Sequence, residues 1–139
     1  MNKLNPIEDN IIEKDQSKQT PAKFELNNHQ TNRLKSGKIL YNKKIHFKFN
    51  EEKLQGYEGD TLSSALLANN KILVGRSFKY HRPRGILGIG VEEPNALMRI
   101  GTGSRVEPNI PATQIEVFDG LVVESQNRWP SLRYDFGAI

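Results

Sequence analysis

One segment, residues 75–98, constrains the fold of this chain more than any other. It begins with cations and aromatic rings, continues through glycines and ends in acids and a proline. Pro83 lacks a backbone donor, and Gly85, Gly88 and Gly90 permit backbone angles that other residues avoid, so no regular helix or strand can run through the segment. We therefore predict a long loop held in one shape by its neighbours. Such loops on a compact scaffold usually carry function.

The residues before this loop predict an opening hairpin. Residues 45–49 (Ile-His-Phe-Lys-Phe) alternate apolar and polar side chains, which is typical of a strand with one buried face. Residues 50–52 (Asn-Glu-Glu) suit a turn, and residues 53–57 then form the second strand.

A short amphipathic helix follows the hairpin. We predict that it begins at Thr61 and that Asp60 accepts a hydrogen bond from its first turn. Asn69 and Asn70 suit a left-handed exit from the helix. The apolar residues that we assign to its buried face are Leu62, Ala65 and Leu66, with Leu67 widening the stripe.

The later apolar runs predict short strands. In chain order we expect a buried strand at 72–74, a returning strand at 96–100, a second polar loop at 101–111, and two runs at 115–117 and 121–123 that flank a turn at Asp119-Gly120. Hairpin, helix, long loop and returning strands, in this order, indicate an α+β protein with a β-grasp fold. In that fold one helix crosses a small mixed sheet.

The β-grasp domain is expected to span residues 33–125. Residues 1–32 are polar and interrupted by Pro6 and Pro21, so we predict a disordered, mobile tail. A partner-binding arm that folds on contact is the alternative for this tail, and only the apolar residues in 24–26 (Phe-Glu-Leu) favour it.

Composition excludes several classes of protein. The 139 residues contain no Cys, which rules out disulfides, thiolate chemistry, Cys zinc sites and a Cys-ligated iron–sulfur cluster within them. The net charge of +4 favours an acidic partner surface or nucleic acid without choosing between them. No apolar run approaches the length of a membrane span or of a signal-peptide core, so a soluble, cytoplasmic protein is the default expectation.

The basic half of the long loop is the candidate functional surface. We predict an interface loop formed by Arg76, Lys79, Tyr80, His81, Arg82 and Arg84. Its cations would face another protein or hydrogen-bond carbonyls at loop turns. The alternative is a single-stranded nucleic-acid platform of cations and stacking rings.

No catalytic, cofactor or metal site is predicted in this chain. His81 lies beside arginines with no carboxylate placed by sequence to orient it, so a structural hydrogen bond is its expected role. Glu92 and Glu93 could pair with the upstream arginines. The glycines at 85–90 and 101–103 match neither a dinucleotide fingerprint nor a phosphate-binding loop.

Two tracts resemble a known family. Residues 56–70 (Gly-Tyr-Glu-Gly-Asp-Thr-Leu-Ser-Ser-Ala-Leu-Leu-Ala-Asn-Asn) and residues 75–98, with their Gly-Arg-Ser-Phe-Lys-Tyr-His-Arg-Pro-Arg-Gly and Glu-Glu-Pro-Asn-Ala-Leu, are similar to the N-terminal region of the alpha subunit of heterotetrameric sarcosine oxidase. That region resembles in turn the 2Fe-2S ferredoxin-like domains of related amine and proline dehydrogenase subunits. The resemblance runs from Arg33 to Ile139.

The resemblance also locates a lost cluster. A plant-type 2Fe-2S loop spaces its first three thiolates as C-x4-C-x2-C, with a fourth Cys farther along the chain. When the cluster-bearing relatives are laid over residues 82–86, their four ligand positions fall at Gly88, Glu93, Ala96 and Thr113. The implied scaffold is therefore ferredoxin-like with every ligand lost. A chance match of the spacing is the alternative.

The implied function is that of a non-catalytic structural module in a sarcosine oxidase alpha subunit. The full flavoenzyme oxidises sarcosine to glycine, and NAD, FAD, FMN and tetrahydrofolate belong to that assembly, with none expected in this chain. Its partners would be the other subunits or the rest of the alpha chain, and residues 126–139 would lead into a missing nucleotide-binding domain. Two other readings stay open: a degenerate ferredoxin-like electron-transfer or interaction protein, and a basic single-stranded nucleic-acid-binding module.

Overall fold

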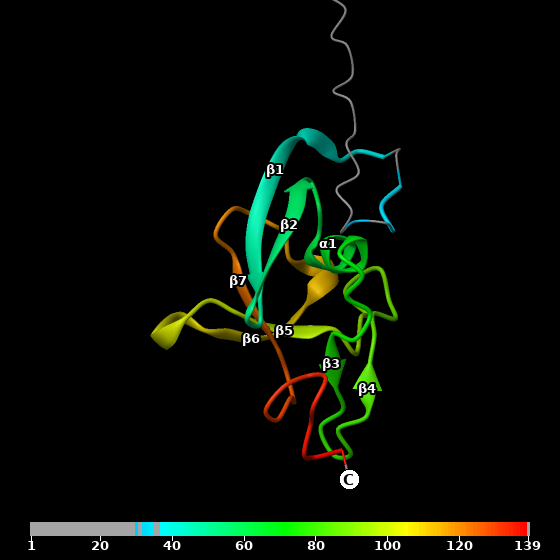
Figure 1. The fold of residues 1–139 in the computed structure, drawn as a ribbon, viewed down its shortest axis with the longest axis vertical. Coiled ribbons are helices and arrows are strands. Elements are labelled where there is room, and N and C mark those ends of the chain that lie inside the picture. Colours follow the sequence, from blue (N-terminus) through cyan, green and yellow to red (C-terminus); the bar gives the residue numbers. More distant parts are fainter. Residues whose placement is uncertain (1–29, 31, 35–36, 139) are drawn as a thin grey trace, which may run out of the picture.

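A computed structural model describes residues 30, 32–34 and 37–138 (Figure 1). The strands are β1 (Leu40–Phe49), β2 (Glu52–Glu58), β3 (Gly75–Arg76), β4 (Pro83–Arg84), β5 (Leu97–Ile100), β6 (Glu107–Pro111) and β7 (Val122–Ser125). The helices are α1 (Leu62–Ala68) and two single 3-10 turns, η1 (Gly103–Arg105) and η2 (Ala112–Gln114). Most of the predicted tail, 1–32, lies outside the described residues.

A mixed five-stranded sheet forms the body of the domain. Its strand order is β2-β1-β7-β5-β6, with β1 and β7 parallel and the other neighbours antiparallel. Helix α1 contacts β2 and η2, and β3 pairs with β4 in a separate two-stranded sheet at the end of the molecule where the C-terminus lies (Figure 1). The predicted fold, a small mixed sheet with one packed helix in a ferredoxin-like domain, is confirmed.

The opening hairpin is confirmed and is longer than expected. Ile45, Phe47 and Phe49 are buried, while the residues between them are exposed, which is the pattern of a strand with one face on the core. Asn50 has a φ of 54°, a left-handed conformation that Asn tolerates at a tight turn. The first strand begins at Leu40, five residues before the alternation that indicated it.

The buried face of the helix is the predicted one, except that it does not include Leu67. Leu62, Ala65 and Leu66 have no exposed surface, and Asn70 takes the left-handed exit with a φ of 58°. Leu67 is 43% exposed, so its assignment to the buried stripe was wrong. At about 100° per residue, Leu67 lies about 140° around the helix from Leu62 and faces away from the sheet.

The cap of this helix also differs from the prediction. Thr61 is the N-cap, and its side-chain oxygen accepts a hydrogen bond from the backbone N–H of Ser64. Asp60 does accept a hydrogen bond from the first turn, but from the hydroxyl of Ser64 and not from a backbone N–H of that turn. It also accepts the backbone N–H of Tyr57 and binds Arg33. The carboxylate therefore joins the helix to the chain before β1.

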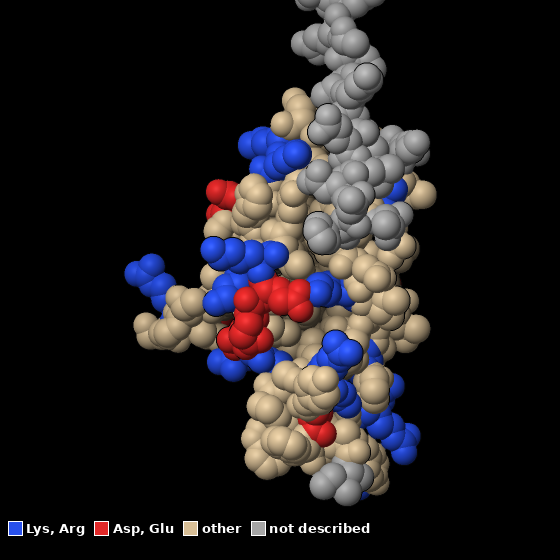
Figure 2. Space-filling model, in the orientation of Figure 1, with Lys and Arg blue, Asp and Glu red and all other residues tan. Residues whose placement is uncertain are grey.

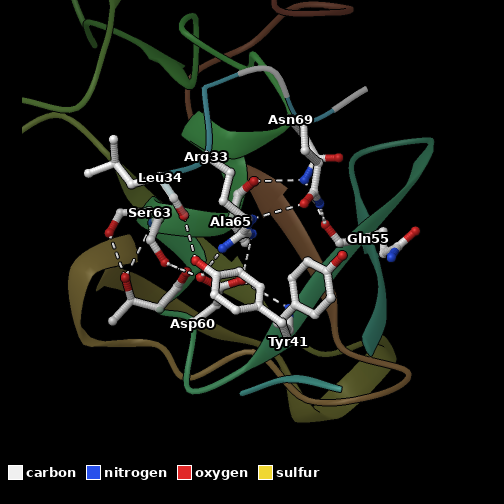
Figure 3. A network of polar contacts seen from close by, with 12 residues as sticks. Arg33, Leu34, Tyr41, Gln55, Asp60, Ser63, Ala65 and Asn69 are labelled. Carbon is white, nitrogen blue, oxygen red and sulfur yellow. Dashed lines mark hydrogen bonds and ion pairs between the residues drawn. The ribbon is translucent and has the colours of Figure 1, made fainter. Parts of the chain in front are cut away.

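Figure 3 shows this buried network. The Arg33 guanidinium binds both oxygens of Asp60, at 3.0 and 2.7 Å, and lies 5.0 Å from the centre of the Tyr57 ring. Arg33 also donates to the side chain of Gln30, whose amide donates to the backbone carbonyl of Gln55. Gln30 thus lies against the domain although it falls within the segment predicted to be a tail.

Three other predictions about local structure need correction. Residues 72–74 are not a strand: Ile72 is 65% exposed, Val74 is buried, and pairing begins only at β3. The predicted polar loop 101–111 contains η1 and β6, and residues 115–117 make only one isolated bridge, from Glu116 to Thr61. Apolar runs of three residues carry too little periodicity to distinguish a paired strand from an extended connection.

Candidate functional site

The basic half of the long loop is a tight hairpin. Gly75 pairs with Arg84 and Arg76 with Pro83, while the N–H of Ser77 donates to the carbonyl of Arg82 at 3.0 Å. His81, with a φ of 48°, closes the turn, and its N–H donates to the carbonyl of Ser77 at 3.1 Å. The backbone of this segment is therefore more regular than the predicted loop. Side chains from the predicted interface loop leave it in two directions.

Arg76 and His81 turn inward, toward the C-terminal segment. The Arg76 side chain is 7% exposed and donates to the backbone carbonyls of Leu132, at 2.9 Å, and His81, at 2.7 Å. The Asp135 carboxylate, which is inaccessible to solvent, lies 3.7 Å from Arg76 Nε and 2.8 Å from His81 Nδ1. His81 Nδ1 and the Asp135 carboxylate do not form a hydrogen bond despite this distance, so their contact is electrostatic.

Asp135 is the anion that fastens the hairpin to the C-terminal segment. Its carboxylate accepts the backbone N–H groups of Trp129, at 2.7 Å, and Gly137, at 2.9 Å. Burial raises the pKa of Asp135, but the two N–H groups and the charges of His81 and Arg76 outweigh burial and lower that pKa below its ordinary value. Asp135 therefore stays ionised and clamps the two segments together.

The remaining cations of the predicted interface loop face outward. Lys79, Arg82 and Arg84 are exposed, and none of them makes an ion pair within the described part of the chain. The exposed ring of Tyr80 lies close to two of them, with its centre 5.2 Å from Lys79 Nζ and 5.2 Å from Arg82 Cζ. Figure 2 shows basic side chains gathered at the end of the molecule where Figure 1 places β4.

Exposed aromatic rings accompany these cations, both in the hairpin itself and in the C-terminal segment that Asp135 holds against it. Phe78 is 85% exposed in the hairpin, and Trp129, Tyr134 and Phe136 are more than half exposed in the C-terminal segment. Of the large apolar residues that the structure describes after position 126, only Leu132 reaches the core. We call the set Phe78, Lys79, Tyr80, Arg82, Arg84, Trp129, Tyr134 and Phe136 the tip surface. Such a concentration of exposed rings is typical of a protein interface.

The glycine-rich half of the long loop encloses two carboxylates. Glu93 is 2% exposed and accepts backbone N–H groups from both ends of the loop, while exposed Glu92 accepts those of Ile89, at 3.1 Å, and Gly90, at 3.0 Å. Neither carboxylate pairs with an upstream arginine within the described residues, so the pairing considered from the sequence was wrong. Backbone donors are closer and fixed in position, whereas an ion pair would require a long side chain to fold back.

The four positions assigned to a lost cluster lie around this loop. Glu93 accepts hydrogen bonds from the backbone N–H groups of Gly88 and, at 2.9 Å, Ala96. The Thr113 hydroxyl donates to the carbonyl of Gly90 at 2.6 Å. Among the described residues no group of three or more His, Asp or Glu side chains could hold a metal ion.

Within the same residues, no helix is long and apolar enough to cross a membrane.

Sequence comparison places the chain among known proteins. A family model described as "2Fe-2S iron-sulfur cluster binding domain" matches residues 42–128. The chain is 58% identical over 105 residues to sarcosine oxidase subunit alpha of Rhizobium meliloti (strain 1021), covering 76% of this chain and 11% of that protein. It is 45% identical over 73 residues to sarcosine oxidase subunit alpha of Corynebacterium sp. (strain U-96), covering 50% and 8%. The chain thus spans about a tenth of the length of these relatives.

A solved structure is also similar. The crystal structure of L-proline dehydrogenase from P. horikoshii matches 60% of this chain and 16% of its own chain, with 31% identity and a TM-score of 0.49. The matching family model covers more than half of the chain, and the relatives confirm homology to the N-terminal part of sarcosine oxidase alpha subunits. The chain belongs to the 2Fe-2S iron-sulfur cluster binding domain family, although its sequence contains none of the cysteines that would ligate a cluster.

Proposed function

We propose that this chain is a non-catalytic structural module of a sarcosine oxidase-type alpha subunit. The observation that carries the proposal is the 58% identity over 105 residues to the Rhizobium meliloti alpha subunit. The full assembly would oxidise sarcosine to glycine, and NAD, FAD, FMN and tetrahydrofolate would bind to parts of it other than these residues. The chain's partners would be the remaining subunits or the rest of the alpha polypeptide.

The tip surface is the part of the module that we assign to contact with the assembly. Its rings would supply apolar contact area, and its cations carry no acidic partner within the described chain. Asp135, Arg76 and His81 hold the hairpin and the C-terminal segment against each other. Because a preformed surface loses little conformational entropy on binding, this clamp favours association. His81 accordingly has a positioning role in the module.

A second function is favoured by the surroundings of Tyr80. A ring flanked by Lys79 and Arg82 at 5.2 Å each could stack on a base while the cations contact phosphates. We favour the protein interface because the homology supplies such a partner. Salt-dependent binding of a labelled single-stranded oligonucleotide would support the second function instead.

The double variant Arg82→Ala/Arg84→Ala tests the interface. We expect weaker co-purification with the remaining subunits of a sarcosine oxidase-type assembly, with the larger loss at low salt, where charge attraction is least screened. Lys44→Ala/Lys48→Ala is the matched control, because it removes two exposed positive charges from β1, away from the tip surface. Equal assembly by both double variants would contradict the assigned surface, and sarcosine oxidation by the isolated chain would contradict the non-catalytic role.

A further inference from the structure

The family binds a 2Fe-2S cluster, and this chain does not fit one. Its sequence has no Cys, and the four positions assigned to cluster ligands hold Gly88, Glu93, Ala96 and Thr113. A loop built around a cluster would nevertheless leave backbone N–H groups directed at its centre, because such groups hydrogen-bond the cluster sulfurs. In this chain, the backbone N–H groups of the loop donate to the Glu93 carboxylate.

Four backbone donors converge on the Glu93 side chain. One carboxylate oxygen accepts the N–H of Leu87, at 2.7 Å, and that of Gly88. The other oxygen accepts the N–H of Asn95, at 2.8 Å, and that of Ala96, at 2.9 Å. The donors come from both ends of the loop, so this single side chain connects its two arms.

This carboxylate is an isolated buried anion held by the backbone alone. No cation pairs with it in the part of the chain that the structure describes, and a buried charge without compensation would be very costly. Burial raises the pKa of Glu93, but the four N–H groups outweigh burial and lower that pKa below its ordinary value. The side chain is therefore ionised, and the loop supplies the donors that keep it so.

We infer that the Glu93 carboxylate takes the place of the 2Fe-2S cluster as the internal anion around which this loop folds. Three of the four assigned ligand positions meet at this carboxylate: Glu93 itself and, through their N–H groups, Gly88 and Ala96. The fourth, Thr113, donates to the carbonyl of Gly90, which also accepts the N–H of Glu93 at 3.2 Å. The two arms of the loop are thus held together by a carboxylate of the chain itself. This inference rests on family membership and not on the proposed function.

The variant Glu93→Gln tests the anion. The amide keeps the size of the side chain but loses its charge and directs an NH2 group at N–H donors. We expect amide hydrogen exchange at Leu87, Gly88, Asn95 and Ala96 to become at least about tenfold faster, together with a lower melting temperature. Glu92→Gln is the matched control, since the Glu92 carboxylate also accepts two backbone N–H groups but is exposed. Unchanged exchange in Glu93→Gln, or the same change in both variants, would overturn the inference.

A titration of the unmodified chain covers the case in which Glu93→Gln does not fold. We expect the carboxyl carbon resonance of Glu93 to stay that of an ionised group below about pH 4, where an unperturbed Glu protonates. Titration of Glu93 at the ordinary value of Glu would overturn the inference without any mutant.

Introducing cysteines at the four assigned ligand positions tests whether Glu93 occupies a cluster-ligand position. The variant Gly88→Cys/Glu93→Cys/Ala96→Cys/Thr113→Cys is reconstituted with iron and sulfide, and bound iron, bound sulfide and the electron paramagnetic resonance signal after reduction are measured. We expect a 2Fe-2S cluster in this variant and none in a control that carries Glu92→Cys in place of Glu93→Cys. Failure of the first variant to take up iron, or equal uptake by both, would refute the assignment of Glu93 to the cluster position.

Discussion

Replacing Arg33 by alanine tests the buried ion pair that joins the start of the domain to its helix. The Arg33 side chain is 4% exposed and that of Asp60 has no exposed surface, and two hydrogen bonds of 3.0 and 2.7 Å connect them. The substitution leaves the Asp60 carboxylate in place with the Tyr57 N–H and the Ser64 hydroxyl as its remaining donors among the described residues. It also removes the guanidinium from the face of the Tyr57 ring.

The expected loss of stability is large for a domain of this size. Removing one partner of a buried pair costs about 3–5 kcal/mol, because the other charge stays buried without its partner. Small domains unfold with a free energy of about 5–15 kcal/mol, so Arg33→Ala should remove a substantial fraction of it. The exposed pair Lys43–Glu58, 2.9 Å apart, should contribute only about 0–1 kcal/mol.

Urea denaturation followed by circular dichroism measures these differences. We expect a lower midpoint for Arg33→Ala and for Asp60→Ala, and a double variant that loses clearly less than the sum of the two. Lys43→Ala is the control for removing a cation from an exposed ion pair. A loss in Arg33→Ala no larger than that in Lys43→Ala, or additive effects in the double variant, would refute the assigned role of the pair.

Further substitutions in α1 and in the C-terminal segment test other parts of the structure. Leu66→Ala should destabilise the domain by about 2–5 kcal/mol in the same assay, because its side chain is fully buried, whereas Leu67→Ala on the exposed side of α1 should change it by about 0.5 kcal/mol or less. Equal losses would contradict the helix orientation. Asp135→Asn should release the C-terminal segment and raise the mobility of Trp129, the only Trp of the chain, measured by fluorescence anisotropy. Unchanged anisotropy would mean that the clamp does not depend on the charge.

The periodicity of apolar residues correctly predicted the elements that bury one face on the core. The alternation at 45–49 and the spacing of Leu62, Ala65 and Leu66 identified one strand and one helix face, because periodic burial leaves a periodic sequence. The prediction for Leu67 is wrong because residues adjacent in sequence point about 100° apart around a helix. The strand predicted at 72–74 is also wrong, because a run of three apolar residues is too short to show the periodicity of a strand.

The candidate site could be predicted only in part, because its decisive contacts are long-range or involve the backbone. The cations of the segment predict an interface loop, and that remains a prediction. Nothing in the sequence indicates that Arg76 and His81 turn inward, because their partner Asp135 comes more than fifty residues later. The sequence shows Glu93 as a charged residue and suggests an upstream arginine as its partner. Its actual donors are backbone N–H groups, which every residue except proline possesses and which no residue-type pattern reveals.

The clamp and the Glu93 loop together predict how the domain responds to acid. The pKa values of Asp135 and Glu93 are lowered in the folded chain, so each carboxyl binds a proton less readily when folded than when unfolded. Their stabilising effect is therefore fully present above the unfolded pKa values, about 3.9 for Asp and 4.3 for Glu, and is lost as pH falls through the lower folded values. We expect the melting temperature to fall as pH drops below about 4. The fall should be smaller in Asp135→Asn and in Glu93→Gln, which lack one of the two carboxyls, and Glu51→Gln serves as an exposed control. If both variants followed the pH profile of the parent chain, the carboxylates would not be the groups that link acid to unfolding.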